Sequence, residues 1–271
     1  MQKTDKTTYP AVLSIAGSDS GGGAGIQADI KSISACGAFA ATVVTATTAQ
    51  NTQGVSDIHA IPVAHIERQL DAVLRDIAFG AIKIGMLHSC AVIDAVQRQL
   101  AAYPTIPIVI DPVMVATSGD KLIADAAIDG LQSFLPSAAL VTPNVPEAAL
   151  LLGKSIDASS FASAAVALGQ RYRTNILLKG GHLALDEHQI TDLLYLYETD
   201  QIISIIHPIV HTANTHGTGC SLSSSISAFI SLGYGLEEAV RKGCDYVHTA
   251  IINGKDKILG KGKGPINHFG I

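Results

Sequence analysis

The chain has 271 residues, and its 18 lysine and arginine residues against 23 aspartate and glutamate residues give a formal net charge of -5. Hydrophobic residues make up 48% of the chain and charged residues 15%, which excludes a disordered protein, while four scattered cysteines without a CxxC pair exclude a disulfide scaffold and a structural zinc site. Because no apolar stretch reaches the ~18 residues of a membrane helix and no basic stripe is present, we expect a soluble, cytoplasmic protein without a membrane or nucleic-acid partner.

Short β-rich runs alternate with helical patterns along the chain. Residues 12–16 predict a buried strand, the spacing of Ile26, Ile30 and Ile33 predicts a helix over 24–36, and 41–48 predicts the next strand. Further buried strands are predicted at 82–84, 106–110, 140–142 and 176–178. Further helices are predicted at 66–77, 89–102, 159–172, 222–233 and 236–251, and extended edge pieces near 55–62 and 190–206.

This alternation predicts an α/β fold. Strands that are apolar on both faces indicate a parallel sheet covered by helices on both sides. No linker or repeat interrupts the pattern, so we expect a single domain over 1–271, with 1–9 frayed. Ligands of such sheets bind beyond the carboxyl ends of the strands. The candidate site residues therefore follow the strands, at 17–23, Gln50, Asn51, 85–86, 111–113, Asn144, Glu147, 179–181 and 216–220.

The first candidate is a glycine tract over 17–23, between a predicted strand and a predicted helix. A dinucleotide fingerprint fails there, because Gly21 and Gly23 would need a third glycine where Ile26 stands. A P-loop fails at 153–155, because its first glycine is replaced by alanine. Two interpretations of the tract stay open: a flexible turn, or a backbone without Cβ atoms that a flat ligand can approach closely.

The most specific signal is the segment 214–220, which stands immediately before a strongly amphipathic helix. Gly217, Thr218 and Gly219 can point free N–H groups at one spot, with the positive helix end behind them, which is an anion hole. Cys220 would lie in the first helical turn, where the pKa of a thiol falls below its usual ~8.5. The alternative interpretation is that Cys220 is only a small buried hydrophobic residue.

Three polar positions follow other predicted strands. Asp111 suits the surroundings of a Mg²⁺ ion or of a phosphate, or starts a turn. Asn144 and Glu147 fit either a nucleotide site or the N-cap and first turn of a helix. Lys179, beside two glycines, can reach a phosphate or can lie solvated at a strand end. None of the ten histidines is assigned to a metal.

Together and in this order, these motifs resemble the ribokinase superfamily, and most narrowly the hydroxymethylpyrimidine and phosphomethylpyrimidine kinases of thiamine biosynthesis. The resemblance implies a ribokinase-like fold with a small β flap, transfer of the ATP γ-phosphoryl group to a pyrimidine hydroxymethyl group or to its monophosphate, Mg²⁺ as cofactor, and a homodimer. The matching stretches are IAGSDSGGGAGIQADIK (15–31), TAQNTQGV (48–55), KIGML (83–87), DPVM and SGD (111–120), TPNVPEAALLL (142–152), LLKGGH (177–182) and NTHGTGC (214–220).

The resemblance also implies roles on the acceptor side of the reaction. Gln50 would hydrogen-bond the aminopyrimidine edge. Cys220 would occupy the place where most of the superfamily has an aspartate base, and it would act either as that base or only by positioning the acceptor hydroxyl. The pyrimidine pocket would be lined by Gly17, Asp29, Met86 and Val113.

On the nucleotide side, the resemblance implies that Asn144 and Glu147 hold the Mg–ATP phosphates through metal and water. Asp111 would join Glu147 around the Mg²⁺ ion, and Lys179 and Thr215 would contact the nucleotide. The anion hole, with Lys179 beside it, would receive the migrating phosphoryl group between Gly217, Thr218 and Gly219.

Two positions depart from the family pattern. A loop that the resemblance places near the adenine reads 260–265 here, with Lys261 where relatives carry histidine. Thr117 stands where relatives often carry a phosphate-contacting lysine, which bears on the monophosphorylated substrate. Three alternative functions stay open at this point: a pyridoxal kinase, a ligand-binding sensor without catalysis, which the intact motif set disfavours, and a nicotinamide dehydrogenase, which the missing fingerprint disfavours.

Overall fold

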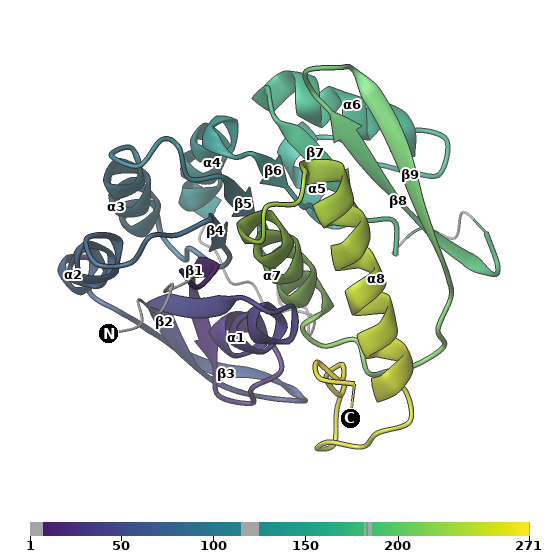
Figure 1. Ribbon diagram of the computed structural model, residues 1–271. Helices are drawn as coiled ribbons and strands as arrows, with labels where there is room; N and C mark the ends of the chain where they lie inside the picture. The colour runs from purple at the N-terminus through teal and green to yellow at the C-terminus, as the bar shows by residue number, and fades with distance from the viewer. Residues whose placement is uncertain (1–7, 115–124, 182, 184–185, 271) are drawn as a thin grey trace, which may run out of the picture.

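A nine-stranded sheet runs through the centre of the computed structural model, which describes residues 8–114, 125–181, 183 and 186–270 (Figure 1). The strand order is β3-β2-β1-β4-β5-β6-β7-β8-β9, and the six strands from β2 to β7 in this order are parallel. The antiparallel strands β3, β8 and β9 form the two edges. The strands are β1 Ala11–Asp19, β2 Phe39–Asn51, β3 Gly54–Ala60, β4 Ala81–Ile84, β5 Ile108–Ile110, β6 Leu140–Val141, β7 Asn175–Leu178, β8 Gln189–Leu196 and β9 Gln201–Pro208.

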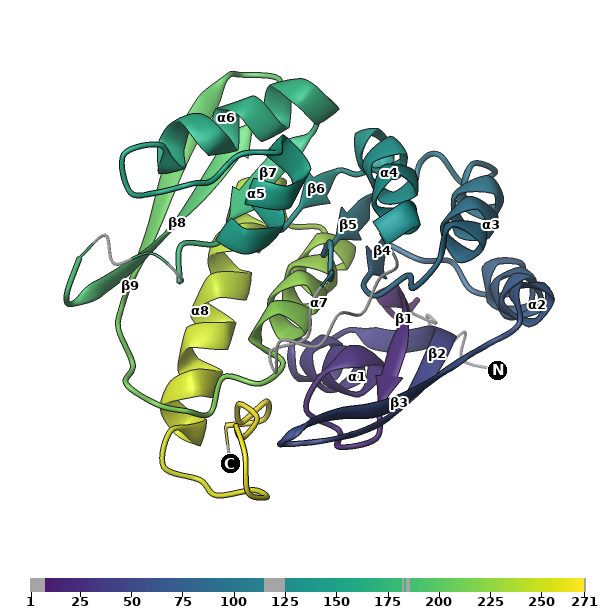
Figure 2. The ribbon, with the colours of Figure 1, turned by 180° about the vertical axis from the view of Figure 1, so that it is seen from behind.

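Helices cover both faces of this sheet, as Figures 1 and 2 show from opposite sides. Helices α1 Gly25–Ala35, α7 Thr218–Ser231 and α8 Leu236–Gly254 pack against one another on one face. The helices on the other face are α2 Val63–Leu74, α3 Cys90–Leu100, α4 Asp125–Phe134, α5 Val145–Leu152 and α6 Phe161–Tyr172. The predicted α/β architecture, a mostly parallel sheet with helices on both faces and a β edge, is therefore confirmed.

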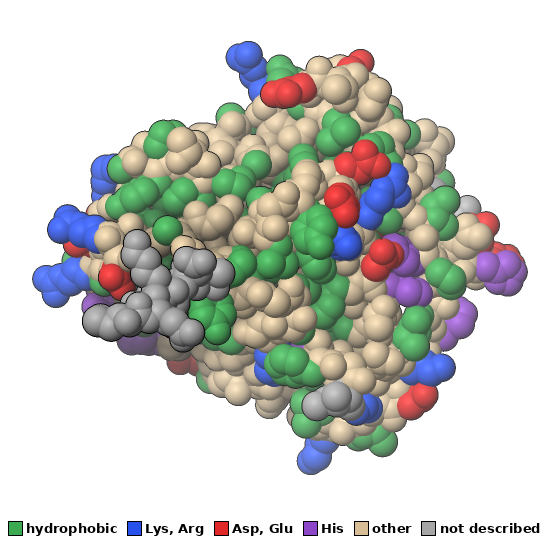
Figure 3. Space-filling view, in the orientation of Figure 1, with side chains coloured by type: hydrophobic (Ala, Val, Ile, Leu, Met, Phe, Trp, Pro, Cys, Tyr) green, Lys and Arg blue, Asp and Glu red, His purple; other side chains and the backbone are tan. Residues whose placement is uncertain are grey.

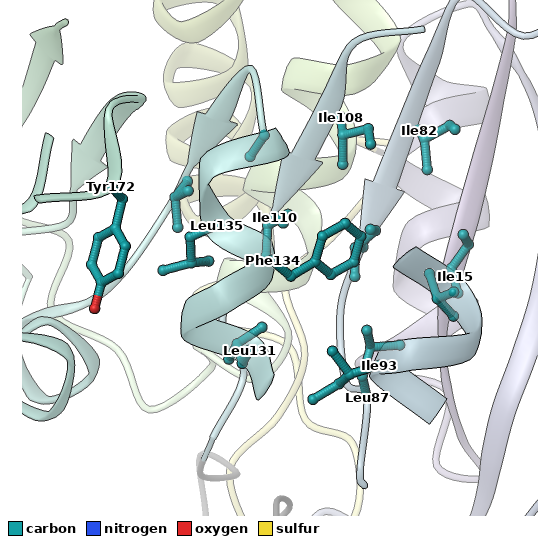
Figure 4. Close-up of a cluster of buried hydrophobic side chains, with 14 of the residues drawn as sticks. Ile15, Ile82, Leu87, Ile93, Ile108, Ile110, Leu131, Phe134, Leu135 and Tyr172 are labelled. Carbon is teal, nitrogen blue, oxygen red and sulfur yellow. The ribbon is translucent and has the colours of Figure 1, made fainter. Parts of the chain in front are cut away.

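The larger core lies between the sheet and the helices from α2 to α6. Ile15, Ile82 and Ile110 point from their strands into this core, where Phe134 of α4 and Ile93 of α3 pack against them (Figure 4). All of these side chains are buried. Alternate residues of a strand face opposite sides of the sheet. The residues next to these isoleucines in each strand therefore point toward α1 and α7, and two of them, Ser14 and Lys83, are polar.

The predicted elements agree with the structure and differ from it at their ends, but no range was predicted for α4, and α5 was expected only as a helix start at Asn144. The helix predicted at 66–77 spans Val63–Leu74, and the edge pieces are β3, β8 and β9. Strands β1 and β2 run further than predicted, so the first residues of the glycine tract and Gln50 lie within strand ends. Among the helices that the structure describes, none has the length and apolarity needed to cross a bilayer. Thr117 and the SGD stretch at 118–120 lie outside the described residues.

Candidate active site

The start of α7 meets the carboxyl ends of the central strands. Helix α7 packs on β1, β4 and β5, and Gly219 in its first turn lies close to both Asp111 and Lys179. A methyl group placed on Gly219 would lie 3.4 Å from Asp111 Oδ2 and 3.4 Å from Lys179 Nζ. The predicted anion hole and the predicted phosphate-contacting lysine are thus neighbours, although 40 positions separate them in the sequence.

Asp111 and Lys179 form an ion pair that is largely shielded from solvent. Lys179 Nζ donates to Asp111 Oδ1 at 3.0 Å, and Thr142 Oγ1 donates to the same oxygen at 3.2 Å. Burial alone would lower the pKa of Lys179, but the carboxylates of Asp111 and Glu147 outweigh burial and raise it. Lys179 therefore carries its positive charge at neutral pH and can neutralise a phosphate.

Asn144 and Glu147 form a capping box at the start of α5. The Asn144 side chain accepts from the N–H of Glu147 at 2.9 Å, and Glu147 Oε2 accepts from the N–H of Asn144 at 2.8 Å. A β-bridge places Asn144 beside Lys179. Burial raises the pKa of Glu147 to about 7; Lys179 opposes this rise and Asp111 adds to it. The helix-capping interpretation is thus correct, and it leaves the Glu147 carboxyl next to the Asp111–Lys179 pair.

The oxygen donors here suit a hard cation held through water. Asp111 and Glu147 are buried carboxyl groups close enough to interact electrostatically. In the part of the chain that the structure describes, no three histidine, cysteine, aspartate or glutamate side chains are arranged to hold a metal ion. Mg²⁺ commonly keeps several waters and takes one or two carboxylates together with substrate phosphates, so this pair fits Mg²⁺ that arrives with a nucleotide.

Cys220 is half-buried and follows Gly219 in the first turn of α7. The N–H of Gly25 donates to its sulfur. Burial raises the pKa of the Cys220 thiol to about 11, because Lys83 offsets burial only in part while Asp29 and Asp111 oppose ionisation. The prediction of a lowered thiol pKa at this helix start was therefore wrong. The positive end of the helix would lower the thiol pKa, but desolvation of the thiolate and two nearby carboxylates raise it by more.

The backbone at the helix start differs in one respect from the expected anion hole. Gly217 is the N-cap, and its φ of 83° is a conformation that favours glycine. The N–H of Thr218 is bonded to the carbonyl of Thr215 at 3.3 Å, and the Thr218 hydroxyl bonds to the same oxygen at 3.1 Å. The first-turn N–H groups of Gly219 and Cys220 have no backbone acceptor among the described residues, so they are the better anion-binding donors.

The predicted pyrimidine residues are only partly brought together. Gly17 packs directly against the side chain of Met86. Val113 is half-buried, and its N–H donates to the carbonyl of Asp111 at 2.8 Å. Asp29, in contrast, is fully buried and exposes no surface for a ligand, so in this structure it does not line an open pocket as expected.

Gln50 lies beside a cavity of about 330 Å³ between the β2–β3 hairpin and the C-terminal loop. Lys261 also lines this cavity. The backbone of the loop is bonded to the hairpin, since Thr52 Oγ1 accepts from the N–H of Lys261 at 3.2 Å and the Thr52 carbonyl accepts from the N–H of Lys263 at 3.0 Å. The loop that was expected near the adenine therefore packs on the hairpin that carries Gln50, and Lys261 belongs to the same side as Gln50.

Sequence reasoning missed two polar residues that support this site. Lys83, between two buried isoleucines of β4, pairs with Asp29 from the α7 side of the sheet. Asp192 of β8 accepts from the N–H of Gly180 at 2.8 Å and so anchors the loop that begins with Lys179. A charged residue inside an otherwise apolar strand was the available signal for Lys83. Asp192 lies in a strand with exposed positions and gave no such signal.

Comparisons with known proteins agree with these features. A family model described as phosphomethylpyrimidine kinase matches residues 19–267. The hydroxymethylpyrimidine/phosphomethylpyrimidine kinase of Rhizobium meliloti is 44% identical over 260 residues, covering 95% of this chain and 96% of the relative. A bifunctional thiamine biosynthesis protein of Geobacter sulfurreducens is 44% identical over 261 residues, and the chain spans 52% of its length.

Solved structures share the fold. A crystal structure of phosphomethylpyrimidine kinase from Clostridium difficile has a TM-score of 0.77 at 37% identity, covering 89% of this chain and 99% of that chain. The pyridoxal kinase of Staphylococcus aureus in complex with ADP has a TM-score of 0.86 at 30% identity, covering 98% of this chain and 95% of that chain. The ribokinase-like fold predicted from the motifs is therefore confirmed.

Proposed function

This chain belongs to the phosphomethylpyrimidine kinase family, and we propose that it transfers the γ-phosphoryl group of ATP to 4-amino-5-hydroxymethyl-2-methylpyrimidine, to its monophosphate, or to both. The observation that carries this proposal is that the start of α7 contacts two groups of candidate site residues at once. Gly219 lies against Asp111 and Lys179, while the sulfur of the adjacent Cys220 accepts from the N–H of Gly25, the first residue of α1, which lies just after the glycine tract. A phosphoryl group at this helix start would have Lys179 on one side and, on the other, the glycine tract beside which we propose that the acceptor lies.

Phosphoryl transfer requires alignment and charge neutralisation more than covalent help. Lys179 supplies a positive charge, and the N–H groups of Gly219 and Cys220 supply donors fixed before the reaction. Donors of this kind are typically worth about 3 kcal/mol each in the barrier. Asp111 and Glu147 would hold Mg²⁺ through water, and the bound ion would neutralise the ATP phosphates. Thr215, whose carbonyl caps the helix start, would face the nucleotide.

Two roles were open for Cys220: a general base, or a group that only positions the acceptor hydroxyl. The raised pKa supports the second role, because a thiol with a pKa of about 11 is protonated at neutral pH. The thiol would then hold the acceptor hydroxyl in line, and the hydroxyl proton would pass late to an oxygen of the transferred phosphoryl group, after most of the new O–P bond has formed.

The acceptor is proposed to lie between the glycine tract and the hairpin. Gln50 would read the aminopyrimidine edge, with Gly17, Met86 and Val113 forming the wall near Cys220. Asp29 would act from behind this wall through its ion pair with Lys83. A homodimer and a cytoplasmic location stay predictions.

Pyridoxal kinase activity is a second candidate function. It is favoured by the similarity to the pyridoxal kinase of Staphylococcus aureus, solved with pyridoxal at a TM-score of 0.86 and 29% identity. Both acceptors present a hydroxymethyl group on a flat nitrogen heterocycle, so the two activities can share one site. The higher identity to the pyrimidine kinases ranks the pyrimidine first.

Product analysis with excess ATP and Mg²⁺ tests the proposal directly. The hydroxymethylpyrimidine is incubated with the enzyme, and mono- and diphosphate products are resolved chromatographically, with pyridoxal in a parallel reaction. We expect pyrimidine phosphates to form. Turnover of pyridoxal with no turnover of the pyrimidine would reverse the ranking, and binding of the pyrimidine without ADP release would indicate a sensor instead of an enzyme.

A further inference from the structure

A buried Asp–His pair joins the glycine tract to the start of α7. His216 Nε2 and Asp19 Oδ2 are 2.9 Å apart, and the two residues are 197 positions apart in the sequence. The side chains are 12% and 2% exposed, respectively. Neither residue has a part in the chemistry described above, although His216 directly precedes the N-cap Gly217.

Asp19 organises the glycine tract around its carboxylate. Oδ1 accepts from the N–H of Gly21 at 2.7 Å, and Oδ2 accepts from the N–H groups of Gly23 at 3.1 Å and Ala24 at 2.8 Å. Burial would raise the pKa of Asp19, but the bonds from His216 and from the backbone outweigh burial and lower it. The carboxylate is therefore ionised at neutral pH, and one charge holds both the tract and the imidazole.

His216 is held from three directions. Gly23 lies so close to the imidazole that a methyl group on it would collide with the ring, and a methyl group on Gly217 would collide with the Gly23 carbonyl. On its other side, the backbone N–H of His216 donates to the carbonyl of Gly264 at 3.1 Å. His216 also lines the cavity that contains Gln50. The residue thus connects the tract, the C-terminal loop and the helix start.

We propose that Asp19 and His216 are positioning residues, and that this Asp19–His216 clamp fixes the anion-binding N–H groups of α7 against the glycine tract. The inference rests on the proposed phosphoryl transfer. The clamp contacts neither Lys179 nor the Asp111–Glu147 pair, so it acts on the alignment between the phosphoryl group and the acceptor and leaves nucleotide binding alone. A misplacement of about 1 Å in such an alignment can cost about 100-fold in rate.

The test compares His216→Leu, His216→Gln and Asp19→Asn in the full-length protein. Leucine removes the hydrogen bond to Asp19, whereas glutamine keeps a side-chain N–H donor. Asp19→Asn keeps the shape and removes the charge. We expect His216→Leu and Asp19→Asn to lower kcat by about 100-fold while the Kd of ADP, measured by calorimetry, stays unchanged. We expect His216→Gln to recover most of the lost kcat.

His207→Leu is the matched control. His207 Nε2 and Asp245 Oδ1 are also 2.9 Å apart, and this second His–Asp pair joins β9 to α8. Figure 3 shows histidine side chains gathered on the side of the molecule that α8, β8 and β9 form. We expect this control to keep the wild-type kcat. Thermal unfolding of every variant separates loss of fold from loss of alignment.

Two results would overturn the clamp. Wild-type kcat in folded Asp19→Asn and His216→Leu would leave the pair a purely structural role, and so would equal losses in His216→Gln and His216→Leu. If His216→Leu does not fold, kcat of Asp19→Asn is compared with kcat of His216→Gln. Equal kcat values in these two variants would overturn the clamp. Turnover by the wild-type enzyme tests the proposed function by itself, whereas the ratio of variant to wild type, with whichever acceptor is turned over, tests the clamp.

Discussion

Lys83 and Asp29 form a fully buried ion pair directly behind the first turns of α7. Lys83 Nζ lies 2.9 Å from both carboxylate oxygens of Asp29. Ser14 Oγ donates to the same carboxylate at 2.6 Å, and Ser224 Oγ donates at 2.8 Å. Burial would lower the pKa of Lys83, but Asp29 outweighs burial and raises it, so the ammonium stays charged. The pair connects β1, α1, β4 and α7 behind the candidate site.

We expect Lys83→Met to destabilise the protein by about 3–5 kcal/mol, because it leaves the Asp29 carboxylate buried without a partner. The double variant Lys83→Met, Asp29→Leu should recover part of this loss, since it removes both charges. Urea unfolding measures each free energy of unfolding. The exposed pair of Arg98 and Glu67 provides the control, and Arg98→Ala should change stability by less than about 1 kcal/mol. A similar small change in Lys83→Met would contradict the structural role of the buried pair.

Cys220→Ala should lower kcat by about 100-fold with little change in acceptor affinity, because the acceptor hydroxyl loses its alignment with the phosphoryl group. The raised pKa adds a second expectation. If the thiol only positions the hydroxyl, the kcat of the wild type should not climb with pH below the thiol pKa of about 11. Steady-state rates over a pH series check this. A tenfold rise per pH unit that Cys220→Ala abolishes would instead assign the thiolate as the base.

Gln50→Ala should weaken binding of the pyrimidine more than binding of ATP, because Gln50 lies on the hairpin and not beside Lys179. Its side-chain oxygen accepts from Thr48 Oγ1 at 3.1 Å, which holds the amide in place in the absence of a ligand. Calorimetric Kd values for the pyrimidine and for ADP give the comparison. Equal losses for both ligands would contradict the placement of Gln50 on the acceptor side.

Glu147→Gln should change the pH dependence of both stability and activity. The pKa of Glu147 is raised from 4.5 to about 7, so between these values the folded protein binds more protons than the unfolded chain, and this group makes the wild type less stable as pH rises. Glutamine at this position can still complete the capping box. Relative to wild type, Glu147→Gln should therefore gain stability across this window, as measured by denaturant unfolding at each pH.

The activity of the wild type should rise with pH, whereas the contribution of Glu147 to stability falls. If ionised Glu147 helps to hold Mg–ATP, kcat/KM for ATP should rise with pH through about 7 in the wild type, and Glu147→Gln should lack this rise. An identical pH profile in both proteins would remove Glu147 from the nucleotide site and leave it only its capping role.

Much of the fold and the location of the site could be predicted from local sequence. The 3.6-residue spacing of apolar side chains in α1 and the short, mostly apolar runs of β1 and β4 identify elements from neighbouring residues alone. The rule that ligands bind at the carboxyl ends of parallel strands then selects Asp111, Asn144 and Lys179, and the structure brings these three residues together.

The sequence by itself therefore determined the order of most elements, the end of the sheet that carries the site, and the glycine-rich segment 214–220 where a helix begins. Tertiary structure alone decided the ionisation of Cys220, the place of the C-terminal loop beside Gln50, and the pairing of Asp19 with His216. The physical reason is that propensity and periodicity act between residues close in the chain, whereas pKa values and ion pairs depend on which distant groups are buried together.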